Sequence, residues 1–228
     1  MHEEPPARYD RIADWYPAWV GDGHGLIVDG VGSLLPPALG GARVLDVACG
    51  HGRAARGVAG LGAQVVGVDL SHDLIASARA REAAEPLGIV YHAADVAALD
   101  EWWDGTPFDG AVCEMAMMDI DDLRATFGAV AAAVRRDGFF SISMVHPCFP
   151  GNEAGLSSWP PDKTYFDEGR WTSSGHNPDG VRIRVGSSHR TMSTYLNALI
   201  DAGFTVERLV EPPASVPTIL LLRSRRAS

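Results

Sequence analysis

The sequence lacks the features that mark several large classes of protein. Its 228 residues contain only three cysteines, at positions 49, 113 and 148, which fit neither a disulfide framework nor a zinc site. Acidic residues outnumber basic ones by 29 to 19, and no basic stripe suited to duplex nucleic acid is visible. No apolar run could span a membrane, and the N-terminus does not resemble a signal peptide. We therefore expect a cytoplasmic protein with no nucleic-acid, membrane or metal partner.

What is present favours one α/β domain over residues 1–228, because 46% of the residues are hydrophobic and 21% are charged. From residue 43, strand-like and helix-like segments alternate, a pattern typical of a parallel sheet with helices on both faces. The predicted fold class is α/β, with a doubly wound, mostly parallel, seven-stranded sheet. The expected strands are 43–47, 64–69, 89–92, 108–113, 139–145, 204–210 and 218–222, with 181–185 also strand-like, and the expected helices are 52–61, 72–84, 121–134 and 191–202.

Three segments depart from this alternation. Residues 8–20 carry aromatic side chains at helical spacing, and we expect an amphipathic helix within an N-terminal helical lid formed by residues 1–40. Residues 147–180 are rich in Pro, Gly, Ser and aromatic residues, and a loop of this length is usually functional, so we expect a cap insertion after the fifth strand. The basic cluster Arg223, Arg225 and Arg226 is expected to be a solvated, frayed tail.

The segment 44–55 carries the strongest functional signal. A strand runs into a Gly-x-Gly turn at Gly50 and Gly52, and the turn opens a helix, as in sites where a ligand approaches the backbone closely. Asp69 follows at the end of the next strand, where a carboxylate can accept hydrogen bonds from both ribose hydroxyls of an adenosine group. These features also satisfy the dinucleotide pattern G-x-G-x-x-A, so a Rossmann NAD(P)-dependent oxidoreductase stays open.

Asp46 favours a different cofactor. A carboxylate inside the first strand is unusual for a buried strand, and it suits a ligand that carries positive charge nearby. S-adenosylmethionine offers a sulfonium and an ammonium group, whereas the pyrophosphate of a dinucleotide would be repelled by an acidic loop.

At these residues the sequence resembles the class I S-adenosylmethionine-dependent methyltransferases, in particular those that act on small molecules. Residues 44–52, 66–70 and 94–96 look like the family's first three motifs, with Ala48 where many members have Gly. Residues 9–16 resemble the helix that covers the cofactor in many members, and residues 189–196 with 202–204 resemble their C-terminal helix and turn.

The resemblance implies S-adenosyl-L-methionine as the cofactor and S-adenosyl-L-homocysteine as its product. The residues that it places at the cofactor are Tyr9, Tyr16, Asp46, Ala48, Gly50, Gly52, Asp69, Leu70, Asp95, Val96 and Cys113. For Asp95 the alternative is a helix cap, and for the two tyrosines it is packing.

The acceptor side is predicted from position and composition. Glu114, Met115 and Met118 follow the fourth strand, at the edge of a parallel sheet where ligands bind, although the methionines could simply pack in the core. Trp159 and Trp171 lie in the expected cap and could shape a site for an aromatic or heterocyclic specialised metabolite. His146 and His189 are candidates for a general base, with a structural role as the alternative.

The acceptor atom (O, N or C) and the oligomeric state cannot be read from the sequence. Besides the oxidoreductase, one further alternative stays open. A protein of the same fold could bind the cofactor without transferring its methyl group, because pocket motifs report binding and not turnover.

Overall fold

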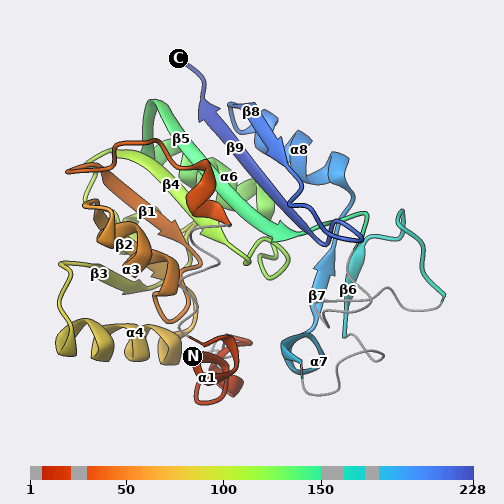
Figure 1. The fold of residues 1–228 in the computed structure, drawn as a ribbon, viewed down its shortest axis with the longest axis horizontal. Coiled ribbons are helices and arrows are strands. Elements are labelled where there is room, and N and C mark those ends of the chain that lie inside the picture. Colours follow the sequence, from red (N-terminus) through yellow and green to blue (C-terminus); the bar gives the residue numbers. More distant parts are fainter. Residues whose placement is uncertain (1–6, 22–29, 150–161, 173–179) are drawn as a thin grey trace.

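The computed structural model describes residues 7–21, 30–149, 162–172 and 180–228, and their central feature is a seven-stranded sheet (Figure 1). The strand order is β3-β2-β1-β4-β5-β9-β8. β9 runs antiparallel to both of its neighbours, and the other adjacent strands are parallel. The predicted mostly parallel, seven-stranded sheet is therefore confirmed. The strands are β1 Arg43–Val47, β2 Gln64–Asp69, β3 Val90–Ala93, β4 Phe108–Glu114, β5 Val134–Val145, β8 Phe204–Val210 and β9 Ile219–Arg226.

Helices cover both faces of the sheet because successive strand residues point to opposite sides. Val44 packs into a cluster with residues of α3 and α4, whereas its neighbour Leu45 packs into a second cluster with residues of α6 and α8. The 3-10 helix η2, Val31–Leu34, lies with the first group and α5 with the second. The α-helices of the two layers are α3 Arg53–Gly60, α4 His72–Ala84, α5 Leu99–Trp102, α6 Leu123–Ala133 and α8 Met192–Asp201.

The N-terminal helix expected over 8–20 is divided into two short pieces. η1 spans Asp10–Ile12 and α1 spans Tyr16–Val20, with Pro17 in the first turn of α1. A proline has no N–H to donate to the preceding turn, so the helical hydrogen bonds cannot continue from η1 into α1. The prediction of one continuous helix was wrong for this reason.

The strand expected over 181–185 is a helix, α7 Val181–Val185. The alternation of valine or isoleucine with arginine fits a strand, but positions 181 and 185 also share one face of a helix. Both valines are buried against Ile12, whereas Ile183 is exposed. A strand would have placed all three on one side, so packing against the N-terminal segment decides the conformation.

A small second sheet, which the sequence analysis missed, lies beside α7 and apart from the main sheet (Figure 1). Its two antiparallel strands are β6 Gly169–Trp171 and β7 Ser187–His189. His189 therefore ends β7 and does not open α8, whose N-cap is Thr191.

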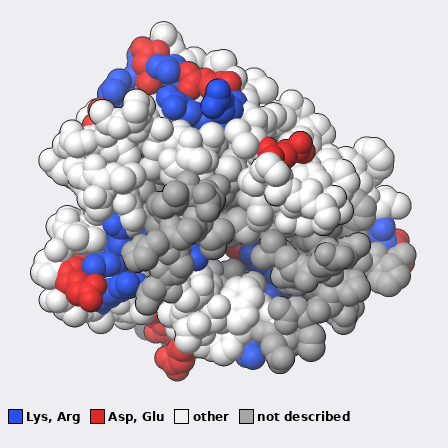
Figure 2. All heavy atoms as spheres, in the orientation of Figure 1, with Lys and Arg blue, Asp and Glu red and all other residues white. Residues whose placement is uncertain are grey.

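The C-terminal arginines are not a frayed tail, because β9 continues to Arg226. Arg223 and Arg225 form ion pairs with Glu207 of β8, at 3.0 and 2.5 Å between Nε and carboxylate oxygens. Between them Ser224 is buried and its hydroxyl donates to the Phe140 carbonyl. Near the C-terminus, at the top of the face in Figure 2, basic and acidic side chains are accordingly interspersed. No helix among the described residues has the length and apolarity needed to cross a membrane.

The conformation of α7 can be tested by two alanine substitutions. We expect Val181→Ala to lower the free energy of unfolding by about 1–2 kcal/mol, because this buried side chain loses most of its apolar contact area. Ile183→Ala removes a larger side chain, but from an exposed position (38% exposed, against 3% for Val181), and should change stability by less than about 0.5 kcal/mol. Urea unfolding measures both, and equal losses would indicate an extended segment.

Candidate functional site

A cavity of about 600 Å³ lies at the carboxyl ends of β1, β2 and β4. The chain order reverses between β1 and β4, and ligands of open α/β sheets bind at such a switch point. The lining comes from the loops after β1, β2, β3 and β4, from the start of α6 and from the N-terminal segment. Eleven of the sequence-predicted site residues line it together: Tyr9, Tyr16, Asp46, Ala48, Gly50, Asp69, Leu70, Asp95, Val96, Glu114 and Met115.

The loop after β1 has a backbone shape that side chains disfavour. Ala48, Gly50 and Gly52 have φ values of 54°, 54° and 83°. Gly52 does not line the cavity. A Cβ atom at Gly52 would lie 2.3 Å from the Tyr91 hydroxyl, so glycine is needed there to let α3 begin against β3. Ala48 occupies a left-handed conformation that favours glycine, so the alanine side chain is held there at a cost in backbone strain.

Asp69 connects this loop to the end of β2. Its carboxylate accepts hydrogen bonds from the backbone N–H groups of Gly50 and Ser71, both at 2.8 Å. Burial raises the pKa of Asp69 to about 6, and these two hydrogen bonds partly oppose the shift. A carboxylate held in this way at the cavity wall retains further lone pairs for ligand hydroxyl groups.

Asp46, Arg53 and Glu114 form a buried charged cluster on the cavity wall. Asp46 is 1% exposed, and within the described part of the chain neither of its carboxylate oxygens has a hydrogen-bond partner. Glu114 Oε1 lies 3.5 Å from Arg53 Nη2, and Arg53 Nη1 also lacks a hydrogen-bond partner there. Burial, and then the Glu114 carboxylate, raise the pKa of Asp46 well above its usual value.

Two carboxylates against one guanidinium leave this wall of the cavity negative, and buried polar groups without partners are costly. A ligand with a positive group for Asp46 and a negative group for Arg53 would satisfy all of them. The amino-acid end of S-adenosylmethionine, with its ammonium, carboxylate and adjacent sulfonium, has this charge pattern. The residues present therefore fit the expected cofactor.

The far end of the cavity contains the third motif. Asp95 accepts a hydrogen bond from the Ala97 N–H at 2.8 Å, so its carboxylate supports the turn that precedes α5. One oxygen is used in this way, and the side chain still lines the cavity together with Leu70 and Val96. The helix cap considered for Asp95 is not observed, because the N-cap of α5 is Ala98, and the turn contact leaves the other oxygen of Asp95 for a ligand.

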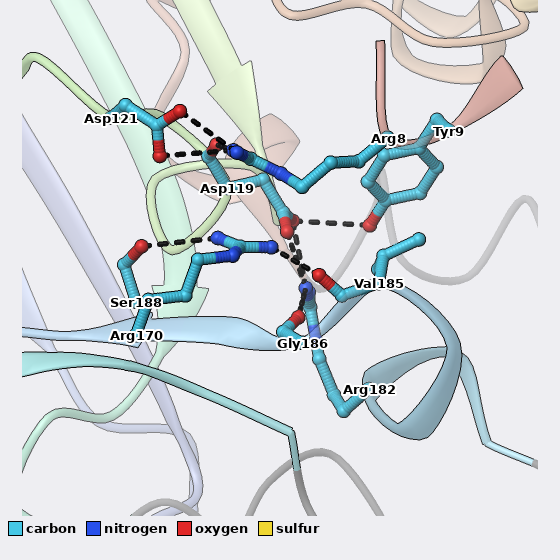
Figure 3. Close-up of polar contacts among 9 residues, drawn as sticks. All are labelled: Arg8, Tyr9, Asp119, Asp121, Arg170, Arg182, Val185, Gly186 and Ser188. Atoms are coloured by element: carbon cyan, nitrogen blue, oxygen red, sulfur yellow. Dashed lines mark hydrogen bonds and ion pairs between the residues drawn. The ribbon is translucent and has the colours of Figure 1, made fainter. Parts of the chain in front are cut away.

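The N-terminal segment touches both sides of the cavity mouth. Asp10 accepts a hydrogen bond from the Ser71 hydroxyl at 2.5 Å on the β2 side. On the β4 side, the Tyr9 hydroxyl donates to Asp119 at 3.1 Å and Arg8 forms an ion pair with Asp121 at 2.8 Å (Figure 3). Residues 8–10 therefore bridge the cavity between the two loops.

Asp119 is a site residue that the sequence analysis missed. Its two oxygens accept hydrogen bonds from Arg182 Nη1 at 2.7 and 2.8 Å, in addition to the contact with Tyr9 (Figure 3). Burial lowers the pKa of Arg182, but the Asp119 carboxylate together with Tyr9 and Tyr16 raises it above its usual value, which keeps this guanidinium charged. The only sequence signal was a run of acidic residues after the fourth strand, because Arg182 is 63 positions away.

Other predicted site residues lie outside the cavity lining. Cys113 and Met118 are buried in the main core cluster. Trp171 lies in β6, where its ring is 5.7 Å from that of His189, and Trp159 lies outside the described residues.

Neither candidate histidine lines the cavity. His146 is buried, with Nε2 2.9 Å from Glu211 and Nδ1 accepting the Cys148 N–H. His189 Nε2 is 2.8 Å from the Tyr165 carbonyl. The geometry shows structural contacts for both rings, and their role as general bases stays a prediction. Within the described ranges no group of three or more His, Cys, Asp or Glu side chains could hold a metal ion.

Comparison with known proteins identifies several relatives. Residues 44–138 match a family described as "Methyltransferase domain". The chain is similar to the crystal structure of an S-adenosylmethionine dependent methyltransferase from Mesorhizobium loti, with a TM-score of 0.71 and 32% identity, covering 90% of this chain and 100% of that one.

Two further likenesses are more distant or more partial. A 1,6-didemethyltoxoflavin-N1-methyltransferase from Burkholderia thailandensis has a TM-score of 0.65 and 19% identity, covering 97% of this chain and 87% of that one, and shares the fold. The ubiquinone biosynthesis O-methyltransferase of Xanthomonas campestris is 33% identical over 109 residues, which are 48% of this chain and 45% of the relative. The match thus spans about half the length of the curated relatives.

The backbone strain at Ala48 predicts the effect of one substitution. We expect Ala48→Gly to raise the free energy of unfolding by up to about 1 kcal/mol, because the left-handed penalty for alanine, about 1–2 kcal/mol, exceeds the entropic cost of glycine. Ala76→Gly, at an exposed position inside α4, is the control and should instead lose about 1 kcal/mol. Thermal or urea unfolding compares the two, and a similar loss in both would contradict strain at Ala48.

Proposed function

The chain belongs to the S-adenosylmethionine-dependent methyltransferases, and from this premise we propose that it transfers the methyl group of that cofactor to a small-molecule acceptor. The observation that carries the proposal is the buried, unpartnered Asp46 beside Arg53 and Glu114 in the cavity. Such an arrangement suits a ligand with separated positive and negative groups, whereas its two carboxylates would repel the pyrophosphate of a dinucleotide.

Each end of the cofactor has a proposed set of residues. Asp46 binds its positive groups and Arg53 its carboxylate. Asp69 accepts hydrogen bonds from the ribose hydroxyls, and Asp95 with Leu70 and Val96 holds the adenine. All six line one cavity, and Asp69 is already oriented by two backbone N–H groups.

The sulfonium supplies an activated methyl group when the cofactor is bound, so the protein contributes mainly alignment and exclusion of water. An acceptor would lie on the β4 side, along Met115, Ala116 and Ile120, which line the cavity there. We propose that residues 8–16 act as the lid over this site, because they contact both sides of its mouth. The cap proposed for 147–180 lies in large part outside the described residues, which omit 150–161 and 173–179.

The substrate class is proposed on two grounds. The cavity of about 600 Å³ lies within the range of small-molecule sites, although the cofactor would take a large part of it. Among the relatives, one is named for ubiquinone biosynthesis and one structure contains 1,6-didemethyltoxoflavin, so both names refer to methylation of ring compounds. An aromatic or heterocyclic acceptor is the class that we propose for this chain.

Calorimetric titration with S-adenosylhomocysteine, and with NAD in parallel, tests the cofactor site. We expect the first to bind and the second not to bind. Asp69→Asn should weaken the binding of S-adenosylhomocysteine about 10- to 100-fold, because hydrogen bonds to a charged group contribute about 1.5–3 kcal/mol.

The matched control is Asp109→Asn. Asp109 also accepts hydrogen bonds from a backbone N–H and an arginine, but it lies at the start of β4, outside the cavity. This variant should bind as the wild type does. Binding of NAD alone would reject the assignment of Asp46, and a methyl-transfer assay over phenols, amines and heterocycles then separates an enzyme from a protein that only binds the cofactor.

A further inference from the structure

Asp46 and Glu114 are two buried acids on the same wall of the cavity. They come from the adjacent strands β1 and β4, and both side chains are at least 95% buried. Neither Asp46 oxygen nor Glu114 Oε1 has a hydrogen-bond partner in the described part of the chain. Because both side chains are buried, the charge on one carboxylate disfavours ionisation of the other. The two acids therefore lose their protons as a coupled pair.

Among the described residues, the groups around the pair include one positive guanidinium and several acidic side chains. Burial raises the pKa of Glu114, and Arg53 of α3, whose Nη2 lies 3.5 Å from Glu114 Oε1, only partly opposes this shift. Asp69 of β2 repels the Asp46 charge further. The thiols of Cys49 and Cys113 and the hydroxyl of Tyr91 on β3 also face the pair, but burial raises the pKa of all three, so they stay neutral near pH 7.

We infer that the Asp46–Glu114 pair carries one more proton when the cofactor in the cavity has a neutral sulfur than when it has a sulfonium. The inference rests on the proposed function and deepens it, because it gives the pair a part in the reaction. With S-adenosylmethionine bound, Arg53, the ammonium and the sulfonium would balance Asp46, Glu114 and the cofactor's own carboxylate. With S-adenosylhomocysteine the sulfonium charge is missing, and one of the two side-chain carboxylates would be left without a counter-charge. After methyl transfer the sulfonium charge is gone, and protonation of one carboxylate restores the charge balance of the site.

The proton balance of the transfer then closes within the cavity. The bond between the methyl carbon and sulfur breaks, and its electron pair stays on sulfur. The acceptor heteroatom forms the new bond to carbon and loses its own proton. That proton is retained on the carboxylate pair, so that the charge lost from the sulfonium is matched by charge lost from the pair. The pair gives this proton to solvent when the product cofactor leaves and the next S-adenosylmethionine binds, which returns the site to its starting state.

Calorimetry of the wild-type protein with S-adenosylmethionine and with S-adenosylhomocysteine tests the inference without any acceptor. Each titration is run at pH 7 in phosphate and in Tris, whose different ionisation heats give the number of protons bound. We expect S-adenosylhomocysteine to bind with an uptake larger by about 0.5–1 proton. By linkage, its affinity relative to S-adenosylmethionine should rise up to about tenfold for each unit that the pH falls, over the range where the pair titrates.

Three variants locate the proton. Glu114→Gln and Asp46→Asn should each remove most of the difference in proton uptake, and either one suffices if the other does not fold. Asp121→Asn, at an exposed carboxylate of the same cavity that pairs with Arg8, should keep it. Equal proton numbers for the two cofactors, or a difference that survives both Glu114→Gln and Asp46→Asn, would overturn the inference. Failure of both cofactors to bind would instead reject the proposed function.

Discussion

The hydrogen bond from the Gly50 N–H to the Asp69 carboxylate sets the geometry on which the rest of the pocket depends. It joins the loop after β1 to the end of β2, and the other Asp69 oxygen accepts the N–H of Ser71. Ser71 is also the N-cap of α4, where its hydroxyl accepts the Leu74 N–H. One carboxylate therefore positions the glycine turn, the start of α4 and the lip of the cavity, and parallel strand pairing brings these parts to one edge.

The same edge holds groups that the fold does not compensate by itself. The folded-state pKa values of Asp46, Asp69 and Glu114 are all raised by burial, and that of Asp69 is about 6. An acid whose pKa is higher in the folded than in the unfolded state binds its proton more tightly when folded. The contribution of these three groups to the stability of the ligand-free protein therefore falls as pH rises from about 4 through the raised values. A bound cation opposes this loss. The same buried carboxylates that destabilise the ligand-free protein therefore strengthen the binding of a positively charged ligand.

Local sequence patterns were sufficient to predict the bounds of those helices and strands whose conformation depends mainly on their own side chains. The bounds of β1, β2, α4 and β8 were predicted to the residue, because valine-rich runs and the Ser71 cap fix them. The sequence failed where distant contacts decide. Val181–Val185 is helical because it packs on Ile12, and Arg225 is ordered by Glu207 of the neighbouring strand. Of the candidate site, the motif residues converge on one cavity, whereas His146 and His189 do not line it.

Asp119 shows why the missing part of the site could not be read locally. It accepts hydrogen bonds from Tyr9, 110 residues earlier in the chain, and from Arg182, 63 residues later. A single aspartate in an acidic run indicates neither partner. Because one carboxylate contacts both, a displacement of α7 would leave the buried Arg182 guanidinium without its counter-charge, whereas a displacement of the N-terminal segment would remove only the Tyr9 hydrogen bond to that carboxylate (Figure 3). A buried charge that loses its partner is strongly destabilising. The N-terminal segment, which we propose as the lid, and α7 therefore share one anchoring carboxylate at the cavity mouth.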